Sequence, residues 1–183
     1  TLYVDEGRRV AGDVEETLRN LREITPEHFP SPPALFSFLL NAMDNDTEFR
    51  DFFFKKLRLI IYGGAALTQD LLDRLQAAAV AATNLRIPVT TKYGSTETTG
   101  ITQAPWPLDI TGHIGIPNAG VTLKLTPVGN HLEVRVKGPC VTPGYLNNPA
   151  ATAKAFDEEG FYCTGDAAKL VDENDPGKGL VFD

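Results

Sequence analysis

The sequence has few cysteines and no long apolar run, and these absences exclude several classes of protein. Only Cys140 and Cys163 occur among 183 residues, so neither a disulfide framework nor a cysteine-based metal site is expected. The longest apolar stretches, such as residues 57–62, are far too short to span a bilayer, and the first residues lack an export pattern. We therefore expect a cytoplasmic protein without a membrane span.

The sequence also has fewer basic than acidic residues, 17 against 24, which gives a net charge of −7. Such a surface repels nucleic acid and polyphosphates at long range, so a bound anion must be met by local donors or by a metal. We expect no nucleic-acid partner. The chain begins at Thr1 and stops at residues 180–183, in what reads as the middle of a strand, and we therefore interpret it as a fragment of a longer enzyme.

The first part of the chain has the pattern of an α/β fold. An amphipathic helix is expected from a cap at Asp13 to a stop at Thr25-Pro26, and residues 34–43 read as a largely buried helix. Residues 57–62 and 87–91 read as strands on either side of a third helix, for which Thr68 is the expected N-cap. The inward stripe of that helix is predicted to be Leu71, Leu72, Leu75 and Ala79. Strand, helix and strand in this order indicate a parallel α/β unit.

From about residue 111 the pattern changes to short alternating runs. Residues 121–125 and 132–136 read as strands, separated by Pro-Val-Gly-Asn and followed by Gly-Pro turn signals. We therefore divide the chain into an α/β part, residues 1–110, and a mainly β part, residues 111–183.

Residues 93–100, Tyr-Gly-Ser-Thr-Glu-Thr-Thr-Gly, are the first candidate for a site. They follow the strand at 87–91, and open α/β sheets bind ligands beyond their strand ends. The segment offers an aromatic face in Tyr93, close backbone approach at Gly94, and hydroxyls such as that of Ser95 for phosphate oxygens. Glu97 adds a carboxylate for a hard cation. By itself, such a turn more often simply caps a following helix.

The second candidate is the segment from Gly144-Tyr145 to Phe161-Tyr162-Cys163-Thr164-Gly165-Asp166. An aspartate held on a tight turn can accept two hydrogen bonds from a ribose diol. An aspartate in a Thr-Gly-Asp turn more often bonds its own backbone. Alone, this second motif is weak.

Together, in this order and separation, the two motifs resemble the signature of the adenylate-forming superfamily, which includes acyl-CoA synthetases, luciferases and peptide-synthetase adenylation domains. Residues 57–67 are similar to the family's strand and Gly-Gly-Ala turn, residues 112–117 to its Gly-x-x-Gly-x-Pro segment, and residues 132–139 to a further strand. Residues 138–145 and 176–183 look most like feruloyl-CoA synthases. The resemblance implies part of the large N-terminal domain, a parallel α/β subdomain followed by a small β-barrel-like one.

In this family a carboxylate attacks the α-phosphate of ATP to give an acyl-adenylate, and coenzyme A then displaces AMP. The resemblance implies that Tyr93 stacks on adenine and that Asp166 takes the ribose hydroxyls. The catalytic pair would be Thr96, on the α-phosphate, and Glu97, on a Mg²⁺ ion. The remaining nucleotide-binding residues would be Gly64, Ala65, Ala66, Gly94 and Ser95.

The resemblance also implies an acyl pocket in the first part, where Gly63, Gly64 and Gly94 would leave room for the acyl group. Plain turn geometry is the alternative reason for these glycines. Residues 29–33, Phe-Pro-Ser-Pro-Pro, depart from the family's aromatic-Val-Pro segment, which leaves the acid open between an aryl or phenylpropenoic (feruloyl-like) acid and a fatty acid.

Two parts of the family's machinery are missing from this sequence, namely the glycine-rich phosphate loop with its lysine and the small C-terminal domain. We therefore expect the remainder of the parent chain as a partner, together with the carboxylic acid, ATP and coenzyme A, and we expect the chain alone to be inactive. A nucleotide- or acyl-binding module without catalysis, and an interaction domain without a ligand, are the alternatives.

Overall fold

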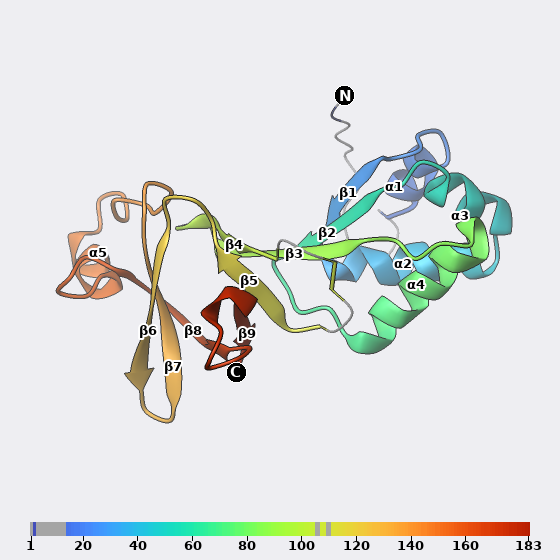
Figure 1. Ribbon diagram of the computed structural model, residues 1–183. Coiled ribbons are helices and arrows are strands. Elements are labelled where there is room, and N and C mark those ends of the chain that lie inside the picture. The colour runs from blue at the N-terminus through green and yellow to red at the C-terminus, as the bar shows by residue number, and fades with distance from the viewer. Residues whose placement is uncertain (1, 3–13, 105–106, 109–110) are drawn as a thin grey trace. The chain divides into compact units, whose positions relative to one another are not determined.

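The computed structural model describes residue 2 and residues 14–104, 107–108 and 111–183. The chain forms two compact units, residues 1–90 and 91–183. Strand β3 (Val89–Ser95) begins in the first unit and continues into the second (Figure 1). This division lies upstream of the boundary predicted near residue 110, which stays a prediction about the family's subdomains.

The first unit is built on short strands covered by helices. Strand β1 (His28–Ser31) pairs parallel with β2 (Leu59–Gly63), and the Ile60 N–H donates to the carbonyl of Pro88, directly before β3. Helix α1 (Val14–Leu21) precedes β1 (Figure 1). The strands predicted at 57–62 and 87–91 correspond to β2 and β3, which are neighbours in the sheet, and β1 adds a parallel strand that was not predicted.

Three helices, α2 (Pro33–Asp44), α3 (Thr47–Phe54) and α4 (Gln69–Thr83), pack on one another. Helix α4 agrees with the sequence, because the Thr68 side chain accepts from the Leu71 N–H and all four residues of the predicted stripe are buried. Helix α3 was not predicted. Its N-cap is Asp46, whose side chain accepts from the Phe49 N–H, and its buried residues are Phe49, Phe53 and Phe54.

Gln76 is the one polar residue among the buried positions of α4. Its Nε2 donates to the Ile87 carbonyl at 2.8 Å and its Oε1 accepts from the Ile87 N–H at 3.0 Å. Both backbone groups of Ile87 are thus paired with one side chain, which ties α4 to the segment leading into β3.

Replacing Gln76 by leucine is therefore expected to destabilise the protein by about 2 kcal/mol or more, since each buried group left unpaired costs about 1–3 kcal/mol. Urea denaturation of the full-length protein would measure the change. The matched control is Gln69→Leu on the same helix, where the glutamine is exposed and bonds Asp73. Equal stability of the two variants would contradict the bridging role of Gln76.

The second unit is an antiparallel sheet in the order β3-β4-β5-β9-β8-β7-β6. Its strands are β4 (Thr99–Gln103), β5 (His113–Pro117), β6 (Thr122–Val128), β7 (His131–Lys137), β8 (Tyr162–Leu170) and β9 (Leu180–Phe182). Helix α5 (Pro149–Ala155) lies between β7 and β8 in the chain, and a 3-10 turn, η1 (Pro176–Lys178), precedes β9 (Figure 1).

The core of this unit explains the alternating runs in the sequence. Val134 and Val136 of β7 are fully buried, as are Ile101 and Ile114. Partly buried Leu123 and Leu125 pack against the same cluster. The strands predicted at 121–125 and 132–136 are confirmed as β6, which runs on to Val128, and β7, which is one residue longer at each end. Among the residues that the structure describes, no helix is long and apolar enough to cross a membrane.

Candidate nucleotide site

The first motif forms a β-hairpin, not a loop before a helix. Strand β3 runs to Ser95, and β4 returns from Thr99 with a register shift between Tyr93 and Gly94. The expectation that the strand ends at Thr91 is therefore wrong. The alternative of a helix cap is wrong too, because the turn is followed by β4.

Gly94 is required by the close approach of the two strands of this hairpin. A side chain there would place its Cβ 1.6 Å from the carbonyl oxygen of Thr99. By contrast, a Cβ at Gly100 would meet nothing within 4 Å. The reason for Gly94 in this geometry is the close approach of two strands, and not the turn conformation that the sequence suggested as the alternative to an acyl pocket.

The hydroxyls of the turn are divided between structure and solvent. Thr98 is buried, and its Oγ1 accepts from the Ser95 N–H at 2.9 Å. The Ser95 Oγ accepts from the Glu97 N–H at 3.2 Å. Thr96 is exposed at the tip. Ser95 and Thr98 thus stabilise the turn, and Thr96 presents its hydroxyl outward.

The second motif forms a bulge within β8 and not a turn between elements. Glu133 pairs with Ala167 and Arg135 pairs with Cys163, so the intervening Thr164-Gly165-Asp166 has more residues than the facing strand. Gly165 adopts a φ of +76°, and the Thr164 hydroxyl donates to the Val134 carbonyl at 2.7 Å. Bulges re-aim side chains, and Asp166 is exposed here.

The two motifs meet at one hydrogen bond. The Tyr93 hydroxyl donates to Asp166 Oδ2 at 2.7 Å, across 73 residues of sequence. The Tyr93 ring is 9% exposed and packs edge to face on Phe182, with ring centroids 5.4 Å apart. Burial raises the pKa of the Tyr93 hydroxyl, which therefore remains a donor. A buried ring thus fixes the orientation of an exposed carboxylate.

Glu97 is joined to a different part of the same unit. Its Oε1 accepts from the Tyr145 hydroxyl at 3.1 Å, and the Tyr145 oxygen lies 3.2 Å from that of Tyr162. Hydrogen bonding from its own backbone N–H, and then from Ser95 and Tyr145, holds the pKa of the Glu97 carboxyl below its usual value. Tyr145 and Tyr162 lie within the second motif, although the sequence pattern predicts no role for either.

The predicted residues thus fall into three groups. Tyr93 and Asp166 are in direct contact, while Gly94 and Ser95 end β3 and Thr96 and Glu97 lie in the turn that follows. Gly64, Ala65 and Ala66 lie in the first unit, where they follow β2 as an exposed segment with Gly64 at a φ of +76°. The nucleotide-binding roles of all these residues stay predictions.

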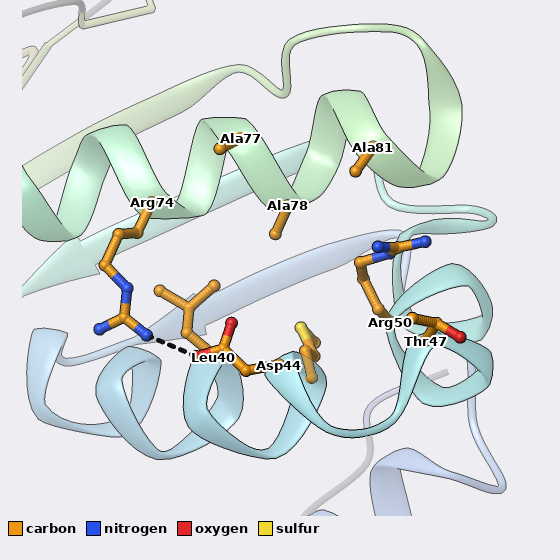
Figure 2. A pocket seen from close by; sticks show the side chains of 9 residues that line it. Leu40, Asp44, Thr47, Arg50, Arg74, Ala77, Ala78 and Ala81 are labelled. Carbon is orange, nitrogen blue, oxygen red and sulfur yellow. Dashed lines mark hydrogen bonds and ion pairs between the residues drawn. The ribbon is translucent and has the colours of Figure 1, made fainter.

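A cavity of about 300 Å³ in the first unit contains none of the predicted site residues. Figure 2 shows Ala77, Ala78 and Ala81 of α4 on one side and Leu40 and Asp44 of α2 on the other. Its arginines are paired, because Arg74 bonds Asp44 at 3.1 Å and Arg50 bonds Asp51 at 2.7 Å. We assign no ligand to this cavity.

The fold and motifs are those of adenylate-forming enzymes, and comparison with known proteins agrees. Residues 2–146 match the family described as AMP-binding enzyme, and the chain belongs to this family. The expected fold, part of the N-terminal domain of such an enzyme, is confirmed by similarity to solved structures.

Similar proteins include several acid–CoA ligases. Long-chain-fatty-acid–CoA ligase 1 of Cavia porcellus is 38% identical over 125 residues, which cover 63% of this chain and 17% of that protein. 2-Succinylbenzoate–CoA ligase of Bacillus licheniformis is 32% identical over 170 residues, which cover 88% of this chain and 32% of that protein. The solved structure of a malonyl-CoA ligase with methylmalonyl-CoA and AMP matches with a TM-score of 0.72 and 30% identity. The match covers 93% of this chain and 36% of that one.

The chain therefore spans about one sixth to one third of the length of these relatives. Their names specify different acids, so the similarity supports the class of acid–CoA ligases without selecting one acid.

Proposed function

We propose that this chain is the adenosine-binding part of an ATP-dependent, AMP-forming acid–CoA ligase. The observation that carries this proposal is the hydrogen bond from Tyr93 to Asp166, since it joins the two motifs that would hold one nucleoside. An exposed carboxylate with a fixed orientation suits a ribose diol, because each carboxylate oxygen can accept more than one hydrogen bond. Both half-reactions of a CoA ligase require the adenosine to be held still.

Beside this pair of residues, the end of β3 and the turn after it, residues 94–97, would bind the phosphates. The exposed hydroxyl of Thr96 would donate to the α-phosphate. Glu97 fits a Mg²⁺ site, because this ion is usually bound by one or two carboxylates together with substrate phosphates. Magnesium bound there would offset the phosphate charge. Tyr93 would stack on adenine with the part of its ring that is exposed.

The acid that we propose is an aryl or phenylpropenoic acid, on the likeness of residues 138–145 and 176–183 to feruloyl-CoA synthases. A fatty acid is the alternative, and the similarity to a long-chain-fatty-acid–CoA ligase supports it. A second alternative is a module that binds nucleotide or acyl groups without catalysis. We also propose that the protein is cytoplasmic, where both free cysteines would stay reduced.

Full-length protein is expected to bind ATP and AMP and to release pyrophosphate when supplied with ATP, Mg²⁺ and its acid. Calorimetry would measure binding, and a pyrophosphate-release assay against cinnamates, benzoates and fatty acids would identify the acid. If the protein binds AMP but releases no pyrophosphate with any of these acids, the non-catalytic module is favoured. Failure to bind either nucleotide would contradict the proposed function.

A further inference from the structure

Glu97 is held at two points by a single loop, residues 138–145. The Thr142 N–H donates to the Glu97 carbonyl at 2.7 Å, and the Tyr145 hydroxyl donates to the Glu97 carboxylate at 3.1 Å. The loop thus forms hydrogen bonds with both the backbone and the side chain of Glu97, which lies at the centre of the turn. A contact that served only to pack the loop would not need to reach the carboxylate.

The end of this loop is held in place by hydrogen bonds to the segment that follows it. The Tyr145 N–H donates to the Thr152 Oγ1 at 2.9 Å, and Thr152 in turn donates to the Asn148 carbonyl at 3.0 Å. The Asn148 side chain caps α5 by accepting from the Ala151 N–H. A Cβ at Gly144 would lie 2.6 Å from the Thr152 side chain, so the approach of loop and helix is close. Tyr145 is therefore anchored independently of Glu97.

The direction of the hydrogen bonds at the two tyrosines follows from counting protons. A tyrosine hydroxyl has one proton. Since Tyr145 gives its proton to the carboxylate, the 3.2 Å contact with Tyr162 must be a donation from Tyr162 to the Tyr145 oxygen. Tyr162 is 8% exposed, and its ring packs edge to face on Phe156 with centroids 5.6 Å apart. A relay thus runs from a buried tyrosine through Tyr145 to Glu97.

We propose that Tyr145 is a positioning residue that fixes the Glu97 carboxylate for a divalent cation shared with the nucleotide phosphates, with Tyr162 orienting the Tyr145 hydroxyl. This inference rests on the proposed function, because it assumes that Glu97 faces a metal–nucleotide complex. One hydrogen bond to Oε1 leaves acceptor capacity on the carboxylate for the cation. Partners of this kind orient metal ligands, and their removal typically costs about 10–100-fold in metal affinity.

The test is Tyr145→Phe in the full-length protein, which removes the hydroxyl and keeps the ring. Calorimetric titrations of ATP at a series of Mg²⁺ concentrations, without acid, are expected to show an apparent Mg²⁺ affinity about tenfold weaker than in the wild type. AMP binding in the absence of Mg²⁺ is expected to stay the same. Tyr162→Phe should weaken Mg²⁺ affinity in the same direction and by less.

Leu146→Ala is the matched control, because Leu146 is the next residue and is 92% exposed. An unchanged Mg²⁺ dependence in both tyrosine variants, with normal ATP binding by the wild type, would overturn this inference and leave the proposed function intact. Wild-type protein that binds no nucleotide would overturn both. If Tyr145→Phe fails to fold, Tyr162→Phe alone decides the outcome by the same titration.

Discussion

Alanine in place of Asp166 is expected to weaken ATP and AMP binding by the full-length protein by at least about a hundredfold. The proposed role gives Asp166 two charge-assisted hydrogen bonds to the ribose, each contributing about 1.5–3 kcal/mol. About 1.4 kcal/mol corresponds to a factor of ten in affinity. The variant also leaves the hydroxyl of the buried Tyr93 without its acceptor at 2.7 Å. Calorimetry with AMP gives the most direct measurement, because it needs neither acid nor turnover.

Two further variants test whether the loss of affinity comes from the negative charge of Asp166 in particular. Asp166→Asn keeps an acceptor for Tyr93 and is expected to bind AMP better than the alanine variant but less tightly than the wild type. Glu173→Ala removes an equal charge at an exposed position of the same unit and is expected to bind normally. Unchanged AMP affinity in Asp166→Ala, in protein that melts like the wild type, would remove Asp166 from the site.

Elements with a strong local pattern were predictable from the sequence. Helix α4 has a threonine cap and an apolar stripe, and both are present in the structure. Strands β6 and β7 alternate and flank a turn at Gly129 with a φ of +60°. In each case the side chains that define the element are close together in the chain, so periodicity was sufficient to find it.

Strand β1 and helix α3 were missed for local reasons. Pro30 lies within β1, and proline argues against a strand unless the strand is at an edge, which is where β1 lies. Asp46 follows closely on the helix predicted at 34–43, where a short polar residue can mark a helix end, and instead it caps the next helix. One residue type can signal either a stop or a start, and sequence alone did not distinguish them.

The candidate site was predictable as a set of residues but not as an arrangement. The pairing of Tyr93 with Asp166 was anticipated only through the family resemblance, and their direct hydrogen bond was not. Tyr145 reaches Glu97 across 48 residues, and a contact between such distant residues leaves no periodicity in the sequence. The Thr164–Asp166 bulge looked like a turn because glycine beside small polar residues is typical of both.

Gly94→Ala is expected to destabilise the protein by about 3 kcal/mol or more, enough to impair folding. The reason is steric, because the new Cβ would lie 1.6 Å from the Thr99 carbonyl oxygen and 2.7 Å from its carbon. These are backbone atoms of the paired strand, so relief requires the hairpin to open and not merely a side chain to rotate. Overpacking of a tight structure usually costs about 1–3 kcal/mol and occasionally more.

Gly100→Ala is the matched control, since a Cβ at Gly100 would have open space around it and the residue lies on the opposite strand of the same hairpin. Thermal and urea denaturation of the two full-length variants should therefore differ sharply. The same comparison decides between the two reasons for Gly94. If Gly94→Ala melts like the wild type and changes only the preference among acids, the acyl-pocket role is correct. If it loses stability while Gly100→Ala does not, the glycine is there because two backbones meet.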